Sequence, residues 1–440
     1  MLGHATLGAR TGGRRTLETG ERYRRYVLAA LTLCYVFNYL DRYVLTILVE
    51  PIKAELGVSD AWMGFLIGPA FAVFYTGLGV PVARLADRHV RRSIVAAGFA
   101  LWSAFTMLSG FARGALDLTL ARIGVGVGEA AGAAPSHSLL SDYFPPERRA
   151  QALAVFQLGV YLGQFLGLAV GGLLVAPLGW RWTFVAVGAP GLLLALLLRL
   201  TVREPTRGAL DPGPRAAAAA GIGEVFRKLW ALASFRWLAV GAGLAAFAGT
   251  GFGFWVPTLF VRIHGWSFAE VGGSYGVISP GSAVLGSLLA GALAGRLGRR
   301  DPRWWLGIPA LSVALSLPFL CGTCLWPTGR GALALAVPSG ILGGGWAPPV
   351  YAAVQNLVPP HMRSLAASIL ILFVTLLGMG AGPWAVGWLS DVLAPRFGPE
   401  GLRYALVGVL GTSAFGAAAL ALGTRSLRAD LAAAHRDSTR

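Results

Sequence analysis

Residues 83–92 read ARLADRHVRR, and residues 291–300 read GALAGRLGRR. The two stretches lie 208 positions apart and share a Leu, an Ala and three arginines. The same separation pairs three small residues of the first half with three of the second: Gly57, Ser59 and Gly64 with Gly265, Ser267 and Gly272. A third match joins residues 145–149 to residues 359–363 at a separation of 214. The chain is therefore expected to contain two halves built from one repeated unit.

Apolar runs recur along the whole chain around these matches. Of the 440 residues, 55% are hydrophobic and only 13% are charged, about half the charge of a soluble protein. This composition excludes a disordered chain, a disulfide scaffold and an ordinary soluble enzyme. It predicts an all-α integral membrane protein with twelve transmembrane helices in two pseudo-symmetric six-helix halves. The predicted spans are 26–49, 62–84, 93–112, 115–140, 150–175, 182–200, 236–261, 269–294, 304–325, 331–357, 364–389 and 402–424.

The longest polar gap divides the chain into its expected parts. The N-terminal bundle is predicted over residues 26–200 and the C-terminal bundle over 236–425, with a linker loop at 201–235. Within the linker, residues 222–230 could form a short amphipathic helix on the membrane surface. Residues 1–25 and 426–440 are predicted to be tails, and residues 1–25 show no apolar segment typical of a cleavable signal peptide.

The distribution of basic residues predicts the orientation. With the N-terminus in the cytoplasm, the cytoplasmic side consists of the two tails and the loops that follow the even-numbered spans. This side holds 28 of the 37 Lys and Arg residues, and the opposite side holds only 7. By the positive-inside rule, both termini and the linker are expected in the cytoplasm. The net charge of +17 is thereby explained by topology, so no nucleic-acid partner is expected. The preference for Arg over Lys suggests a bacterial protein, which would lie in the inner (plasma) membrane.

Several motifs resemble those of a known family. Residues 83–92 resemble the loop signature G-x-L-x-D-R-x-G-R-R of the major facilitator superfamily, with Ala83 and Val90 in place of its two glycines. In the second copy Gly295 replaces the Asp, which puts a full charge latch there in doubt. Segments 38–42, 122–129, 135–145, 179–182 and 203–205 resemble the Spinster-like branch, over about residues 26–425. The resemblance implies a transporter, and animal members of that branch carry lysophospholipids and sphingolipids.

Four charged residues lie inside predicted spans. These are Asp41 and Arg42 in the first span and Arg122 and Glu129 in the fourth. Arg122 and Glu129 are seven positions apart and so share a helix face. The superfamily resemblance places both spans beside the transport path, so we expect the charges to converge there. A structural ion-pair cluster that joins the two spans is the alternative.

Proton coupling follows from this chemistry, because a buried carboxylate beside an Arg can bind and release a proton when the distance between them changes. Asp41 is the first candidate for the proton carrier and Glu129 the second. Arg122 is the natural partner for a carboxylate or a substrate phosphate. Arg42 could play the same part, or could face away. Protons are the expected coupling ion, and neither a cofactor nor a metal is expected.

Other polar residues in the spans have two interpretations each. Gln157, Tyr161 and Gln164 form a stripe on one helix face, either as a wall of the binding cavity or as interhelical hydrogen bonds. His137 could relay protons or could orient Ser136 and the helix end. No acidic residue is expected inside the spans of the C-terminal half. There the candidate cavity residues are Phe247, Phe252, Phe254, Trp255, Ser282, Trp346, Phe373 and Thr375.

A cytoplasmic gate is expected at the loop signature. Asp87 lies near the start of the third span, where the helix dipole favours a negative charge, with Arg88, Arg91 and Arg92 around it. An enzyme is not expected, because the six His residues are scattered and no metal-binding or catalytic set is present. No nucleotide-binding loop of the Walker type occurs, and the glycines at 124, 126 and 128 follow no strand.

The sequence thus predicts a secondary transporter that works by alternating access and is coupled to protons. The charges lie in one half and the aromatics in the other, which suits an amphiphilic substrate such as a lysophospholipid or a sphingosine-phosphate-like lipid. The alternative is an exporter of small organic solutes or drugs. Membrane lipids are expected partners, and the protein is expected to be a monomer.

Overall fold

The computed structural model describes residues 20–208, 210, 221–359 and 362–438. Over these ranges the chain is helical and contains no β-strand. Its first part forms α1 (Glu21–Ile47), α2 (Val49–Leu56), α3 (Asp60–Ile67), α4 (Pro69–Arg88), α5 (Arg91–Ser109), α6 (Ala115–Glu129), α7 (Ala133–Tyr143) and α8 (Pro146–Thr201). Its second part forms α9 (Ile222–Ala231), α10 (Ala233–Arg262), α11 (Phe268–Arg300), α12 (Trp304–Leu325), α13 (Gly329–Gly343), α14 (Ala347–Asn356), α15 (Arg363–Val374), the π-helix η2 (Thr375–Ala381), α16 (Gly382–Phe397), the 3₁₀ helix η3 (Gly398–Glu400) and α17 (Gly401–Ser438).

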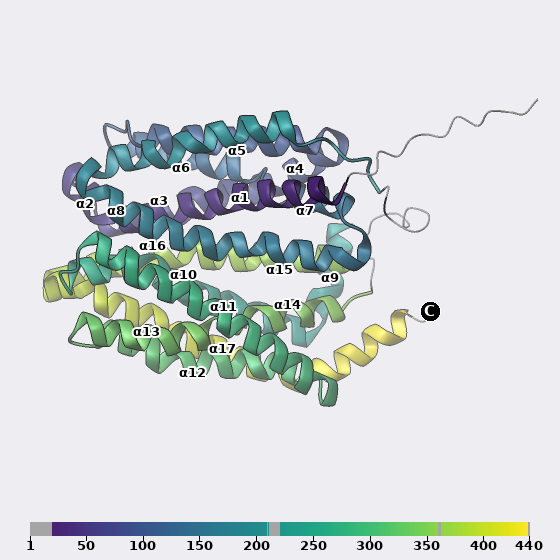
Figure 1. The fold of residues 1–440 in the computed structure, drawn as a ribbon. Helices are drawn as coiled ribbons and strands as arrows, with labels where there is room; N and C mark the ends of the chain where they lie inside the picture. Colours follow the sequence, from purple (N-terminus) through teal and green to yellow (C-terminus); the bar gives the residue numbers. More distant parts are fainter. Residues whose placement is uncertain (1–19, 209, 211–220, 360–361, 439–440) are drawn as a thin grey trace, which may run out of the picture.

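The helices lie side by side in two groups, shown in Figure 1 with α1–α8 in purple to blue above and α10–α17 in green to yellow below. We call these groups the N-terminal half and the C-terminal half. The end at which α1 begins and α17 finishes is called the tail end, and the opposite end, where α2 lies, is called the far end. The halves contact each other mainly through α8 with α11 and through α3 with α16.

The internal repeat has a physical basis at the far end. Gly57 and Gly265 both adopt left-handed backbone conformations, with φ values of 64° and 66°, which favour glycine. Two positions later, Ser59 and Ser267 each cap a helix by accepting a hydrogen bond from the backbone N–H three residues on. The two halves therefore make the same turn into α3 and α11, as the repeat predicts.

The membrane-spanning character agrees with the sequence. Eight helical stretches among the described residues are long and apolar enough to cross a membrane. Two of them, Pro146–Thr201 and Leu365–Ala434, run to 56 and 70 residues, well beyond the ~20 residues that one span needs. The first is broken at Gly179, where φ is 70°. If each of these two stretches makes two spans, the eight stretches supply ten. The segments α1 and α6–α7, which contain the buried charges and are not among the eight, bring the helices to the twelve spans that the sequence predicts.

Several predicted boundaries differ from the structure. The predicted second span is two helices, because the chain breaks at Gly68 between α3 and α4. The amphipathic helix expected over 222–230 is present as α9. Residues 426–438 were predicted as tail, but they continue α17, since Arg428 is held to Asp301 at 2.7 Å and the helix keeps its packing against the C-terminal half. Residues 1–19 and 211–220 lie outside the described residues.

Candidate functional site

The four charged residues predicted inside spans come together between α1 and α6. The guanidinium group of Arg42 lies 2.6 Å from a carboxylate oxygen of Glu129, and Arg122 lies 3.5 Å from Asp41. All four residues are at most 4% exposed. Each carboxylate thus pairs with an arginine of the other helix, so the two ion pairs cross between α1 and α6. We call these residues the charge cluster.

Arg42 is also surrounded by aromatic rings and reaches the other half of the protein. Its guanidinium carbon lies 4.7 to 4.9 Å from the centroids of Tyr39, Phe71 and Tyr75, a distance at which a cation is attracted to a ring. Its Nη1 atom donates to the sulfur of Met379 at 3.6 Å. Met379 belongs to η2, and π-helical turns occur frequently at functional sites. Arg42 therefore connects Glu129 to the C-terminal half.

The charge cluster is incompletely hydrogen-bonded. Asp41 Oδ1, Glu129 Oε1 and Arg122 Nε are buried and have no hydrogen-bond partner among the described residues. The amide oxygen of Asn38, one turn before Asp41, is in the same condition. Buried polar atoms are normally paired, so unpaired ones suggest a place for a proton, a water molecule or a ligand. These atoms make the cluster the candidate functional site.

The polar stripe of α8 faces the C-terminal half at one position. Gln164 donates a hydrogen bond of 3.1 Å to Ser279 on α11, whereas Gln157 is exposed and Tyr161 is half-buried. His137 packs edge-on against Phe156 with ring centroids 5.2 Å apart, and its Nε2 has no partner in the described ranges. The stripe therefore contains one interhelical hydrogen bond and one side chain open to its surroundings.

The residues predicted as a gate lie at the tail end, but their contacts differ from those expected. Asp87 lies in the last turn of α4 and not at the start of α5, so the helix dipole does not favour its negative charge there. Asp87 and Arg88 are exposed, and Asp87 has no side-chain partner in the part of the chain that the structure describes. Arg91 instead lies 2.5 Å from Asp142 and 2.8 Å from Glu204. These carboxylates are buried or half-buried beside it, whereas Asp87 points to the surroundings.

The segment after α8 is fastened to the same loop. Arg92 donates from its side chain to the carbonyl of Val202 at 2.7 Å and from its backbone N–H to Glu204 at 3.0 Å. Arg207 donates to the carbonyls of Ala86 and His89 at the end of α4. Arg91 and Arg92 therefore bind the start of the linker to the N-terminal half and do not gather around Asp87.

A second charged group at the far end escaped the sequence analysis. Arg262 of α10 donates to Asp60 of α3 at 2.6 and 2.8 Å and to Glu50 of α2 at 2.6 and 2.9 Å. Lys53 also pairs with Asp60. The Asp391 carboxylate accepts from the backbone N–H groups of Asp60 and Ala61, and it thereby caps α3 with a residue of the other half. We call these residues the far-end clasp, because they hold the two halves together.

The far-end clasp shows where sequence reasoning stopped. Asp391 lies inside α16, so the expectation that no helix span of the C-terminal half holds an acidic residue is wrong. That expectation rested on ending one span at residue 389, and it overlooked Glu270, which lies in the predicted span 269–294 and in the first turn of α11. The partners Asp60 and Arg262 are about 200 positions apart, so no local pattern could have joined them. The one available signal was the repeated turn at 57–59 and 265–267, beside which both residues lie.

Tight helix crossings accompany the far-end clasp. A Cβ atom on Gly64 would lie 2.5 Å from the carbonyl oxygen of Pro383, and one on Gly272 would lie 2.5 Å from that of Leu168. Both approaches join the two halves, and both need a residue without a side chain. Gly64 and Gly272 are repeat-related, so the two halves use the same position to contact each other.

Three of the six aromatic residues expected to line a cavity in the C-terminal half are buried, and the other three, Phe247, Trp346 and Phe373, are half-buried. Phe252, Phe254 and Trp255 are at most 7% exposed, and Tyr43 of α1 stacks on Phe254 with centroids 5.2 Å apart. Within the described ranges, no three His, Cys, Asp or Glu side chains gather as metal ligands. The site that remains is the charge cluster, which can exchange protons or bind an anion.

The comparisons with known proteins agree with this fold. Residues 31–383 match the family model described as Major Facilitator Superfamily. A protein of Mycolicibacterium smegmatis named MFS-type efflux pump is 34% identical over 88% of this chain and 89% of its own length. Protein spinster homolog 1 of Xenopus tropicalis is 28% identical over 94% of this chain and 84% of its own.

A solved structure gives the same result. The crystal structure of a bacterial homologue of the human lysosomal transporter Spinster, in an inward-facing and unoccupied conformation, aligns with a TM-score of 0.86. It is 32% identical and covers 93% of this chain and 99% of that one. The protein is therefore a membrane transporter and not an enzyme. The chain belongs to the major facilitator superfamily, and within it to the Spinster-like transporters.

Proposed function

We propose that this protein is a proton-coupled carrier of an amphiphilic, lipid-like molecule, and that it works as a monomer by alternating access. The observation that carries the proposal is the charge cluster. Two buried carboxylates each keep one oxygen without a partner, and one of their arginines contacts the other half. A purely structural ion-pair cluster would be expected to satisfy these atoms, because unpaired buried polar atoms destabilise a fold.

We assign the tail end to the cytoplasm of a bacterial cell and the far end to the outside. The excess of Lys and Arg in the tails and in the loops of the tail end supports this orientation. With it, the far-end clasp closes the outer side. The likeness to a Spinster homologue solved in an inward-facing conformation fits the same assignment.

Protonation would act through the contacts of the cluster. Asp41 is our first choice for the proton carrier, because its pair with Arg122 is long at 3.5 Å and its other oxygen is unpaired. Glu129 is the second choice. Neutralising Glu129 would leave Arg42 as a buried charge without its partner, which costs roughly 3–5 kcal/mol. Arg42 also contacts Met379 of the C-terminal half, so a displacement of Arg42 that relieves this cost would change a contact between the halves. Protonation would in this way favour movement of one half against the other.

The substrate class rests on the uneven distribution of charge. The buried charges of the cluster lie in the N-terminal half, while η2 and α10 present Met, Phe and Gly residues. An arginine of the cluster would bind the phosphate of a lysophospholipid or a sphingosine-phosphate-like lipid bidentately. The apolar tail would lie along the C-terminal half. The similarity to spinster homologues supports this class.

A second candidate is an exporter of small organic solutes or drugs. The observation in its favour is the similarity to a mycobacterial protein named as an efflux pump. The two candidates differ in what the arginines do, since an uncharged or cationic drug does not need two buried guanidinium groups.

Transport into proteoliposomes tests both. We would compare lysolipids, sphingoid bases, sugars and cationic drugs with and without an imposed pH gradient. Saturable lysolipid uptake that follows the gradient in the unmodified protein and loses it in Asp41→Asn is the expected result. If Asp41→Asn keeps the normal pH dependence of transport, Glu129 becomes the candidate proton carrier. Glu129→Gln would then be measured in the same assay. Saturable transport of a drug or sugar without any response to lysolipids would replace the amphiphile with the second candidate.

A further inference from the structure

We propose that a groove between α1 and α8 at the tail end binds an anionic phospholipid of the surrounding bilayer, with its phosphate at Arg25 and Arg148. This lipid would be a resident of the membrane and not the transported molecule. The proposal concerns the outer surface of the N-terminal half and not the charge cluster, and it takes from the proposed function only the orientation of the tail end towards the cytoplasm.

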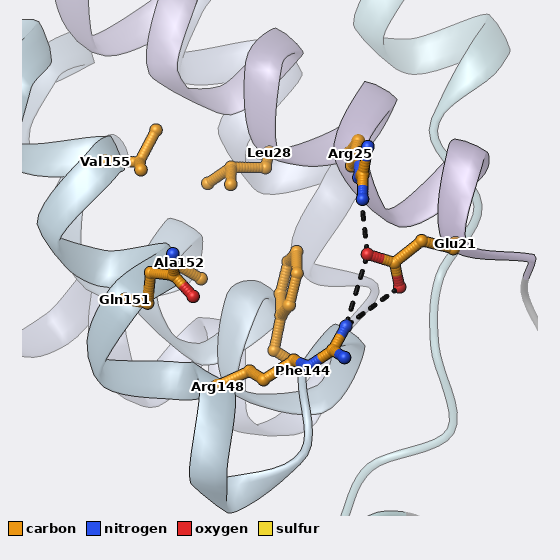
Figure 2. Close-up of a pocket in the computed structure, with 8 residues that line it drawn as sticks. All are labelled: Glu21, Arg25, Leu28, Phe144, Arg148, Gln151, Ala152 and Val155. Carbon is orange, nitrogen blue, oxygen red and sulfur yellow. Dashed lines mark hydrogen bonds and ion pairs between the residues drawn. The ribbon is translucent and has the colours of Figure 1, made fainter.

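The polar end of the groove holds two guanidinium groups. It is a hollow of about 450 Å³ lined by Glu21, Arg25, Leu28, Phe144, Arg148, Gln151, Ala152 and Val155. Figure 2 shows the carboxylate of Glu21 lying between Arg25 and Arg148, with Leu28 and Val155 on the opposite side of the hollow. The two arginines come from different helices but point to one carboxylate. They can therefore converge on one phosphate in the same way.

The apolar end continues from the same residues along the helices. A second hollow of about 380 Å³ shares Arg25, Leu28 and Val155 with the first. It extends past them along α1 to Val36 and along α8 to Leu162. From Arg25 to Val36 the rise along α1 is ~16 Å, close to half of the ~30 Å hydrocarbon core. The length and the position suit one acyl chain of the leaflet at the tail end.

The groove faces away from the contact between the halves. Val155 and Leu162 line it, whereas Gln157 and Gln164 lie two positions further along α8. Two positions on a helix correspond to a rotation of about 200°, which is nearly the opposite face. Gln164 contacts Ser279 of the C-terminal half, so the groove lies on the other side of α8. Leu33, Val155 and Leu162 are 38–49% exposed, as expected for side chains that contact lipid.

The charges of the groove favour an anionic lipid over a zwitterionic one. Two arginines and one glutamate leave one net positive charge, at the level of the lipid headgroups. The pairs that Glu21 makes are long, at 3.3 Å to each arginine, and their side chains are 44–74% exposed. Exposed pairs of this kind are weak, so a phosphate can displace the carboxylate. Basic pockets between helices on the cytoplasmic side are known to hold acidic headgroups.

The test measures lipid binding to the full-length protein by native mass spectrometry in mild detergent, with phosphatidylglycerol and phosphatidylcholine as probes. We expect tight binding of one phosphatidylglycerol. The double variant Arg25→Gln and Arg148→Gln should weaken it by roughly 10- to 30-fold. The control Arg299→Gln with Arg300→Gln removes the same charge from the tail end of α11, outside the groove, and should leave the affinity unchanged.

Two further measurements keep the proposal open to refutation. Glu21→Gln removes the competing carboxylate and should raise the affinity for phosphatidylglycerol. Inorganic phosphate alone should not protect the protein against thermal unfolding, because it lacks the acyl chain. Equal binding of both lipids, an unchanged affinity in the groove variant, a lower affinity in Glu21→Gln, or protection by phosphate alone would each overturn the proposal.

Discussion

The two ends of the α3–α4 segment show how differently this protein treats its far end and its tail end. Residues 60–72 include nine buried residues and pack against α16 and η2 of the other half. Residues 73–85 of the same segment include no buried residue, and a Cβ atom added at Gly77 or Gly79 would meet nothing within 4 Å. The α3–α4 segment thus buries residues at one end only. We expect its second end to make contacts with the other half in the opposite state of the carrier.

The largest effect is expected from filling the far-end crossing. Gly64→Leu would place a side chain against the backbone of Pro383, and overpacking of this kind costs about 1–3 kcal/mol. We expect the far end to separate, which spin-label distances between α3 and α16 would show as a longer, broader distribution. Gly77→Leu, the matched change on α4, should leave these distances unchanged. Equal behaviour of the two variants would remove the contrast between the ends.

Breaking the far-end clasp should have the next largest effect. Arg262→Gln leaves Asp60 and Glu50 without their shared partner, and we expect a loss of about 1–3 kcal/mol in the state closed at the far end. Faster labelling of a cysteine placed beside Asp60 would report it. The control is Arg181→Gln, because Arg181 pairs with Glu55 at the same end but within the N-terminal half. A control variant that opened as readily would show that charge loss alone was responsible.

A smaller effect is expected at the tail end. Asp87→Asn removes a charge that has no partner among the described residues, so the thermal stability of the present arrangement should not change. It should lower only the population closed at the tail end, by the ~0.2–1 kcal/mol typical of an exposed ion pair. Spin-label distances between the tail ends of α4 and α15 would measure this shift, with Glu147→Gln as the control. A lower melting temperature would instead give Asp87 a role in the arrangement described here.

The smallest effect concerns a contact inside one half. The backbone N–H of Arg303 and the guanidinium group of Arg428 hold the pKa of Asp301, which lies between α11 and α12, below its ordinary value. The stabilisation is therefore complete above the ordinary carboxyl pKa and is lost as the pH falls through the lowered one. Asp301→Asn should reduce the hydrogen-exchange protection of residues 425–434 at neutral pH. The distances between the halves should stay the same, and a change in them would show that α17 couples to the gate.

The sequence alone was sufficient for the fold and for the family. Hydrophobic runs long enough to span a membrane, together with a repeat at 208 positions, fixed the two-part helical architecture because both signals are local or periodic. The charged residues of the cluster were also found from sequence, since Asp41, Arg42, Arg122 and Glu129 interrupt apolar spans where charge is costly. Their possible roles followed from their chemistry, but their pairing did not.

Only the tertiary structure decided which charges meet. Arg42 pairs with Glu129 and not with its neighbour on α1, because the crossing of α1 and α6 sets the distances. Arg91 pairs with Asp142 and Glu204 and leaves Asp87 exposed, because the segment after α8 folds back onto the start of α5. The far-end clasp joins residues about 200 to 330 positions apart. The contacts of the far-end clasp depend on how the two halves are placed against each other, and that placement leaves no periodic trace in the chain.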